Sequence, residues 1–282
     1  TAEGIYHALG EYGVTHLCGA PIIMSMIAQA PERQRRAFEQ KVKLMTAAAP
    51  PPASVISAME SMGISVTHVY GLTEVYGPAV VCAEKETWQA LPLDEQAKLK
   101  SRQGVAYELE EDVLVLDPET AQPVPWDGAT QGEVAFRGNI VMRGYFKRPE
   151  DTANAFREGW FWSGDLAVQH PDGYIEIKDR AKDIIISGGE NISSIEVENA
   201  LYSHPAVSLV AVVAMSDETW GEVPCAFVEL TDDDSNITEA ELIAHARTSL
   251  ASFQRPKKII FGELPKTSTG KIRKNELRDR LR

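Results

Sequence analysis

The pattern of apolar and polar positions along the chain changes twice. Up to about Gly71, helical spacings alternate with short apolar runs, which predicts helices and strands in turn. From Arg102 to Lys178, short alternating segments are separated by Asp-Pro, Asp-Gly and Pro-Asp-Gly turns. After Asp183, helical and strand patterns mix again. The predicted parts are a partial parallel α/β part over residues 1–101, a small β-rich part over 102–181 and a compact α+β domain over 182–282.

The predicted elements can be given in chain order. In the first part they are helix Gly4–Tyr12, strand Thr15–Cys18, helix Pro21–Ala30, strand Val42–Thr46, helix Ala53–Met62, strand Ser65–Tyr70 and an exposed polar helix over Glu84–Ser101. In the second they are strands Val113–Leu116, Gly132–Phe136 and Tyr174–Lys178, with helix Pro149–Phe156. In the third they are strand Ile184–Ile186, helix Ile195–Ser203, strands Val207–Met215 and Val223–Leu230, helix Glu239–Ser249, strand Ile259–Phe261 and a basic C-terminal helix.

Composition narrows the class of protein. The 282 residues are 44% hydrophobic and 24% charged, which is typical of a globular protein. A net charge of −13 argues against nucleic-acid partners, and no apolar run is long enough for an integral membrane segment. Three isolated cysteines fit reduced thiols and a cytoplasmic protein. Because the chain starts at Thr1 directly before a helical pattern, we expect it to be part of a longer protein, and a homo-oligomer stays open.

Two predicted strand ends carry candidate chemistry, because parallel sheets bind ligands at the carboxyl ends of their strands. One is the turn Ala47–Pro52, where proline prevents further pairing. The other is Tyr70-Gly71-Leu72-Thr73-Glu74, whose hydroxyl and carboxylate suit a phosphate oxygen and its Mg²⁺, while Tyr70 could stack on a base. An ordinary polar turn at a strand end stays open for both.

A carboxylate follows aromatic residues in Trp162-Ser163-Gly164-Asp165. Such a carboxylate can accept hydrogen bonds from both hydroxyls of a ribose, as acidic residues do in dinucleotide sites. An aspartate that accepts only from turn amides fits the same letters.

The stretch Asp179–Ser193 places mixed charges before a short buried strand, and Gly188-Gly189 then interrupts that strand. This sequence of elements is suited to a hinge between two domains, and an ordinary strand–turn–helix is also compatible with it. Farther on, Pro265–Lys271 resembles a phosphate loop but lacks its first glycine, and Ile272 follows Lys271 in place of Ser or Thr. What remains is a Ser/Thr/Gly loop that presents a lysine able to neutralise developing negative charge, unless that lysine is simply solvated.

Together and in this order, these motifs resemble the adenylate-forming superfamily, which includes acyl-CoA synthetases (fatty-acid–CoA ligases), luciferases and peptide-synthetase adenylation domains. The resemblance covers essentially the whole chain. Within the superfamily, Ala47–Pro52 and Val75–Glu84 resemble the branch with 3-methylmercaptopropionate–CoA ligase and the plant acyl-activating enzymes. The motifs that carry the resemblance are Tyr70–Glu74, Ser163–Asp165, Asp179–Asp183, Gly188–Asn191 and Pro265–Lys271.

The resemblance implies an ATP-dependent, AMP-forming acid–CoA ligase that uses a small-molecule carboxylic acid, ATP, Mg²⁺ and coenzyme A. A carboxylate would attack the α-phosphate of ATP, and the CoA thiol would then displace AMP. By this analogy Thr73 contacts the phosphate, Glu74 holds Mg²⁺, and Tyr70-Gly71 lies against adenine. Ala48-Ala49-Pro50 would line the adenine and acyl side, and Asp165 would hold the ribose.

The same analogy assigns the third part as a lid. Arg180 would help to hold the ribose, and Lys271 would assist adenylation. Lys182 would be the hinge about which the lid turns, which brings Gly188-Gly189 to the pantetheine channel.

Two departures and two alternatives accompany this interpretation. The superfamily's phosphate loop has no counterpart in the chain, so we expect the 282 residues alone not to adenylate efficiently, although weak AMP binding is compatible. Alanine also replaces the glycine that is frequent at the adenine turn. The alternatives are an adenylate-forming enzyme that loads a carrier-protein thiol or an oxygen, and a non-catalytic nucleotide-binding module.

Overall fold

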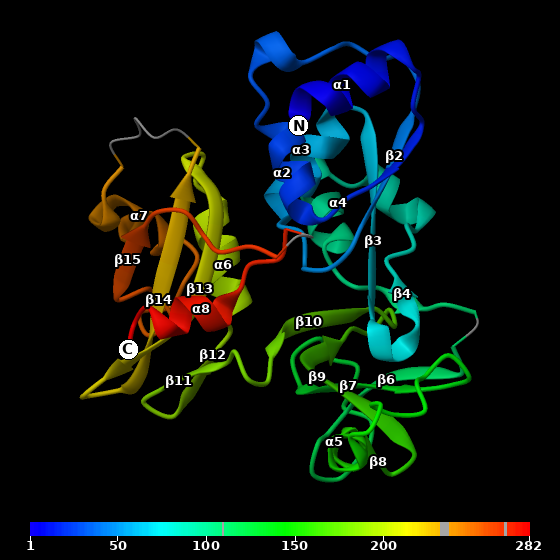
Figure 1. The fold of residues 1–282 in the computed structure, drawn as a ribbon, viewed down its shortest axis with the longest axis vertical. Helices are drawn as coiled ribbons and strands as arrows, with labels where there is room; N and C mark the ends of the chain where they lie inside the picture. Colours follow the sequence, from blue (N-terminus) through cyan, green and yellow to red (C-terminus); the bar gives the residue numbers. More distant parts are fainter. Residues whose placement is uncertain (109, 232–236, 268–269) are drawn as a thin grey trace. The chain divides into compact units, whose positions relative to one another are not determined.

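The computed structural model describes residues 1–108, 110–231, 237–267 and 270–282. The chain divides into two compact units, Thr1–Lys178 and Asp179–Arg282, and each is described by itself (Figure 1). Three five-stranded sheets with helices confirm the expected mixture of α/β and α+β structure. Ser268 and Thr269 of the predicted lysine loop lie outside the described residues.

The first sheet of unit 1 is parallel only in part. Its strands lie in the order β1 (His16–Cys18), β2 (Val42–Thr46), β3 (Ile64–Leu72), β4 (Gly77–Val81) and β5 (Val105–Ala106). The first three strands are parallel, as predicted, but β4 and β5 are antiparallel. Strand β4 was not predicted, because it begins with Gly77-Pro78 and both residue types have a low propensity for strands. β5 joins this sheet although it follows the expected subdivision at residue 101.

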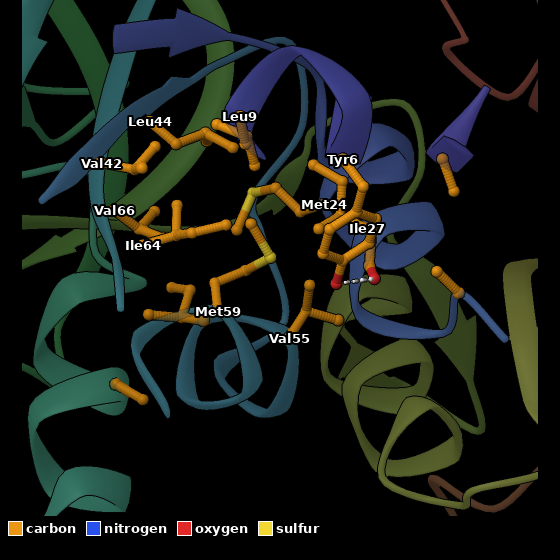
Figure 2. Packing of buried hydrophobic residues seen from close by; sticks show 14 residues of the cluster. Tyr6, Leu9, Met24, Ile27, Val42, Leu44, Val55, Met59, Ile64 and Val66 are labelled. Atoms are coloured by element: carbon orange, nitrogen blue, oxygen red, sulfur yellow. Dashed lines mark hydrogen bonds between the residues drawn. The ribbon is translucent and has the colours of Figure 1, made fainter. Parts of the chain in front are cut away.

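Helices α1 (Ala2–Glu11), α2 (Pro21–Ala28) and α3 (Ala53–Ser61) pack their apolar faces around β2 and β3. Figure 2 shows the resulting core, in which Met24 and Met59 lie among aliphatic side chains. Tyr6 is buried in it, and its hydroxyl donates to the Ile27 carbonyl at 3.2 Å. Each fully buried large side chain of this kind contributes roughly 1.5–3 kcal/mol to stability. A short 3₁₀ helix, η1 (Glu32–Gln34), lies between α2 and β2.

The prediction of one exposed polar helix over Glu84–Ser101 was wrong. Pro92 separates a 3₁₀ helix, η3 (Glu86–Ala90), from α4 (Leu93–Lys100). Both contribute buried residues, including Trp88 and, unexpectedly, Lys100. The Lys100 ammonium tolerates burial because Glu60 and Glu84 lie 2.7 and 3.3 Å from it.

The second sheet of unit 1 has the order β10-β9-β7-β6, with β8 paired to β9. Its core also takes in Ala79 and Val80 of β4, and Val75 from the turn between β3 and β4, so the two sheets share apolar contacts. The predicted strands and helix are all present. The sequence missed the long β9, because a glycine interrupts its apolar pattern. The bounds are β6 Asp112–Leu116, β7 Gln131–Arg137, α5 Pro149–Ala155, β8 Phe156–Arg157, β9 Trp160–Gln169 and β10 Ile175–Arg180.

Unit 2 is a sheet in the order β12-β11-β14-β13, with β15 parallel to β14. Helices α6 and α7 bury apolar faces against it, and Ser193 and Thr238 cap their N-termini. Gly188-Gly189 does not lead directly into a helix as predicted. It forms the turn of a hairpin, and β12 precedes α6. The bounds are β11 Ile185–Ser187, β12 Glu190–Ile192, α6 Ser194–Tyr202, β13 Val207–Asp217, β14 Gly221–Leu230, α7 Glu239–Ala246, β15 Lys258–Phe261 and α8 Lys274–Asp279.

In the part of the chain that the structure describes, no helix has both the length and the apolar character needed to span a bilayer.

Glu110 of unit 1 is a buried carboxylate. It is only 7% exposed, and neither of its carboxylate oxygens has a hydrogen-bond partner among the described residues. Burial, with smaller contributions from the charges of Glu111 and Asp112, raises the pKa of Glu110 to about 7. The charged carboxylate is therefore destabilised in the folded protein.

We predict that Glu110→Gln raises the free energy of unfolding by about 1–2 kcal/mol at pH 8. The folded pKa lies above the ordinary value of 4.5, so the folded state loses stability as the pH rises through about 7. The gain should therefore disappear at pH 4.5 and below. Urea unfolding across this pH range measures it, with the exposed neighbour Glu111→Gln as the control. A gain of equal size at every pH would contradict the explanation.

Candidate functional site

Two of the predicted nucleotide-binding residues lie together in unit 1. The Tyr70 hydroxyl on β3 donates to Asp165 Oδ2 on β9 at 2.7 Å, although the two residues are 95 positions apart. Asp165 is 3% exposed, so its negative charge lies in a largely desolvated position. The hydrogen bond therefore fixes both the ring of Tyr70 and one oxygen of the carboxylate.

A β-bulge in β9 sets the direction in which the Asp165 side chain points. On β9, the three residues Ser163–Asp165 lie against a single residue of β7, Val134. The Ser163 hydroxyl donates to the Val134 carbonyl at 2.7 Å, and the Gly164 amide donates to Glu133 Oε1 at 2.7 Å. Gly164 has φ +75°, which favours glycine. Bulges of this kind turn a side chain away from the regular alternation of a strand.

The Glu74 carboxylate is held by a hydrogen bond from Tyr145, which lies in none of the predicted motifs. Glu74 lies in η2 (Thr73–Val75), directly after β3, and its Oε1 accepts from the Tyr145 hydroxyl at 3.0 Å. The Glu74 carbonyl accepts from the Met142 amide at 2.7 Å. Partial burial, and then the bond to Glu74, raise the pKa of Tyr145, so its hydroxyl stays a donor. Nothing in the local sequence around Tyr145 indicated this contact, which joins residues 71 positions apart.

The donor set around Glu74 fits Mg²⁺. Among the described residues no group of three or more His, Cys, Asp or Glu side chains is arranged for a metal ion. Mg²⁺ needs no such cage, since it commonly takes one or two carboxylates together with substrate phosphates and water. Glu74 offers one carboxylate beside the exposed Thr73 at a strand end. Glu74 is therefore the residue that would hold Mg²⁺ here, as one oxygen ligand.

Gly71 is required by the sheet itself. A Cβ atom at this position would lie 1.7 Å from the Gly77 carbonyl oxygen of β4. The register between β3 and β4 also shifts between Tyr70 and Gly71. The absence of a side chain therefore allows the two backbones to approach at the strand end that carries Thr73 and Glu74.

The predicted adenine turn follows β2, which is the parallel neighbour of β3. Ala48 has φ +80°, a left-handed conformation that costs a non-glycine residue about 1–2 kcal/mol. The hydroxyl of Thr46 at the end of β2 is buried and has no hydrogen-bond partner among the described residues. Ala49 and Pro50 continue the same turn. Backbone strain and an unpartnered polar atom therefore occur together at this strand end.

In unit 2, carboxylates hold both ends of the segment Arg180–Lys182, which we call the hinge segment. Before it, the buried Asp179 accepts from the backbone amides of Ser194 at 2.5 Å and Arg180 at 2.7 Å. After it, Asp183 forms an ion pair with Arg278 of α8. Burial raises the pKa of Asp179, although the nearby Lys274 opposes the shift. The exposed Lys182 lies between the two anchored carboxylates.

The turn Gly188-Gly189 joins β11 to β12. Both glycines have left-handed φ angles, +59° and +90°. At Gly188 a Cβ atom would lie 2.7 Å from the ring of Trp220, whereas at Gly189 nothing lies within 4 Å. The Gly188 amide also donates to the Trp220 carbonyl at 2.8 Å. The turn therefore presents bare backbone, and the indole ring lies against one of its two glycines.

Lys271 lies exposed in a tight loop of unit 2. Its backbone amide donates to the Thr267 hydroxyl at 3.0 Å, and its carbonyl accepts from the Thr267 amide at 2.8 Å. These bonds give the base of the loop a defined geometry. The predicted residues thus fall into two sets, one in each unit: Tyr70, Gly71, Thr73, Glu74, Ala48, Ala49, Pro50 and Asp165 in unit 1, and Arg180, Lys182, Gly188, Gly189 and Lys271 in unit 2.

Comparison with known proteins identifies the family. Residues 2–146 match the family model described as "AMP-binding enzyme", which spans more than half of the chain. The chain belongs to the AMP-binding enzyme family. Residues 196–271 match the AMP-binding enzyme C-terminal domain. Membership confirms the resemblance to the adenylate-forming superfamily.

Relatives in the AMP-binding family include an acetate–CoA ligase of Humulus lupulus, which is 53% identical over 99% of this chain and 50% of its own length. A peroxisomal acetate/butyrate–CoA ligase of Arabidopsis thaliana is 50% identical over 100% of this chain and 50% of its own length. The chain therefore spans about half the length of the curated relatives that it matches.

Solved structures of similar fold include an anthranilate CoA ligase in complex with anthranoyl-AMP, with a TM-score of 0.84 and 25% identity over 100% of this chain and 52% of that protein. ATP-bound MatB from Rhodopseudomonas palustris has a TM-score of 0.81 and 28% identity over 99% of this chain and 53% of that protein.

The two glycines of the hairpin turn provide a matched pair of variants. We predict that Gly188→Ala destabilises unit 2 more than Gly189→Ala does. Both lose a left-handed glycine, worth about 1–2 kcal/mol, but only the first also displaces the Trp220 ring. Urea unfolding measures the stabilities, and the difference in native tryptophan fluorescence between each variant and the wild type reports on Trp220, because the four other tryptophans lie in unit 1. Equal destabilisation without a change in the native spectrum of Gly188→Ala would contradict the observed packing.

Proposed function

We propose that this chain supplies part of the nucleotide site and the lid of an ATP-dependent, AMP-forming acid–CoA ligase. In the first half-reaction, a carboxylate oxygen attacks the α-phosphorus of ATP, and the bond to pyrophosphate breaks. In the second, the CoA sulfur attacks the acyl carbon, the bond to AMP breaks, and the thiol proton is released. The observation that carries this proposal is the hydrogen bond from Tyr70 to the buried Asp165. Tyr70 lies near the end of β3, within the residues that match the AMP-binding family.

In unit 1, each residue has a role that its position supports. Asp165 accepts from the ribose hydroxyls, and Tyr70, which donates to Asp165, lies against the adenine. Thr73 donates to the phosphate of the adenylate. Glu74, oriented by the Tyr145 hydroxyl, holds Mg²⁺, which supplies positive charge against the phosphates. The turn Ala48-Ala49-Pro50 lines the adenine and acyl side.

In unit 2, the proposed roles divide between the two half-reactions. Lys271 brings positive charge to the α-phosphate during adenylation, and Arg180 contributes to the ribose site. The lid, which we place at residues 182–282, then turns about Lys182 and presents Gly188-Gly189 to the pantetheine of CoA. Bare glycine backbone suits that role, because a narrow thiol chain has to pass close to the main chain.

We propose a short aliphatic acid as the substrate. The names of three relatives at 50–53% identity specify acetate, acetate or butyrate, and 2-methylpropanoate. An aryl acid is the second candidate, since a relative from Petunia hybrida at 48% identity is named for trans-cinnamate. An acceptor other than CoA also has support, because an amide bond synthetase shares the fold with a TM-score of 0.83.

An acid panel tests this proposal directly. The full-length protein that contains this chain should form CoA thioesters with acetate, butyrate or 2-methylpropanoate faster than with cinnamate. Pyrophosphate release without thioester formation would favour a different acceptor, such as a carrier-protein thiol. The 282-residue chain by itself should release no pyrophosphate with any acid. Robust release by this chain would overturn the expectation that further residues are needed.

We predict that Lys271→Ala in the full-length protein lowers the rate of acyl-adenylate formation by about a hundredfold or more, because charge stabilisation in the transition state is lost. AMP binding should stay within about twofold. Pyrophosphate release and isothermal titration with AMP measure the two effects. The exposed Lys258→Ala, in the same unit, is the control. Unchanged adenylation in Lys271→Ala would reject the role of this lysine.

We also propose a cytoplasmic location, which rests on the three reduced cysteines. The names of two relatives specify the peroxisome. Imaging of a tagged full-length protein beside a peroxisomal marker distinguishes the two compartments.

A further inference from the structure

One ion pair links the base of the lysine loop to the sheet of unit 2. The Lys266 ammonium lies 3.2 and 2.9 Å from the two carboxylate oxygens of Glu229 on β14. The same carboxylate accepts from the Leu264 amide at 3.3 Å. The two charged side chains are 25% and 29% exposed, so the pair is partly shielded from solvent. Glu229 therefore contacts the chain twice as it enters the loop.

Backbone hydrogen bonds connect this ion pair to Lys271. Lys266 forms an antiparallel bridge with Ile272, the residue directly after Lys271. Below it, the Arg273 amide donates to the Pro265 carbonyl at 2.9 Å. A displacement of Lys266 would therefore move the backbone on both sides of Lys271. The ion pair therefore lies at the root of the segment that carries Lys271.

Loss of the ion pair between Lys266 and Glu229 is expected to change the adenylation rate more than the stability of unit 2. A partly exposed ion pair contributes little to the folding of a domain, because water screens the two charges. A reacting group that is displaced by about 1 Å can lose up to a hundredfold in rate. An ion pair that holds the root of a loop can therefore affect catalysis without much effect on the fold.

We propose that Lys266 and Glu229 are positioning residues for the adenylation half-reaction, because they hold the loop that presents Lys271. This inference rests on the proposed function of Lys271. It assigns the pair to adenylation alone, since the thioester half-reaction does not use Lys271. Neither side chain needs to contact the substrate.

The test uses the full-length protein and measures the two half-reactions separately. Glu229→Gln and Lys266→Met should each lower kcat for pyrophosphate release about tenfold, with the KM for ATP nearly unchanged. Thioester formation from added synthetic acyl-adenylate and CoA should keep its rate. The charge swap Glu229→Lys with Lys266→Glu should recover part of the adenylation rate, because it restores the ionic attraction but not the contact with the Leu264 amide.

The control is Asp279→Asn, which removes an ion pair with Arg282 in the same unit. It makes the same chemical change as Glu229→Gln but leaves the Lys266 contact intact, so both half-reactions should keep their rates. If Glu229→Gln slows both half-reactions equally and lowers the melting temperature, the pair has only a structural role and the inference is wrong. If one variant does not fold, the other variant and the charge swap still decide.

The outcomes also separate this inference from the proposed function. If Lys271→Ala leaves adenylation unchanged, the proposed function of the lysine fails. If Lys271→Ala abolishes adenylation while Glu229→Gln and Lys266→Met do not slow it, only the positioning inference fails.

Discussion

The buried carboxylate of Asp165 sets the central constraint on unit 1. A desolvated charge needs hydrogen-bond donors or a cation, and Tyr70 supplies a donor from the other sheet. This single bond connects β3 to the β9 bulge, and the bulge in turn depends on Gly164. The close approach of β3 and β4 at Gly71 then places Thr73 and Glu74 beyond the same strand. The positions of Tyr70, Thr73 and Glu74 thus depend on how strand β3 ends.

Much of the fold could be predicted from the sequence. Val42–Thr46 was predicted with the observed bounds, because its alternation of buried and exposed residues is strict. Where the pattern is interrupted, prediction failed for physical reasons. Strand β9 was missed because Gly164 interrupts its pattern, and β4 because it begins with Gly77-Pro78. Strand β12 was missed because Gly188-Gly189 precede it. The buried Lys100 was missed because its partners, Glu60 and Glu84, come from elsewhere in the chain.

The candidate site was predictable as a set of motifs but not as a geometry. The sequence pointed to Tyr70 and Asp165 separately, and only the structure shows that one donates to the other. The role of Tyr145 could not be predicted, because its contact with Glu74 joins residues 71 positions apart and depends on the path of the chain. The strained φ of Ala48 was equally hidden, since an alanine gives no local sign of a left-handed conformation. The roles of these residues in catalysis remain proposals.

The anchoring of the hinge segment has a mechanical consequence. Asp179 and Asp183 are each held by partners within unit 2, whereas the residues between them carry no core side chain. The Arg180 carbonyl also accepts from the Asp183 and Ile184 amides at 2.9 and 3.2 Å, so the segment is closed by hydrogen bonds inside unit 2. Turning its backbone dihedral angles would break these bonds, each of which contributes roughly 0.5–1.5 kcal/mol. The proposed rotation about Lys182 therefore has to release local hydrogen bonds but no apolar core, and the strength of these bonds sets a barrier that selection can adjust without altering the core of the unit.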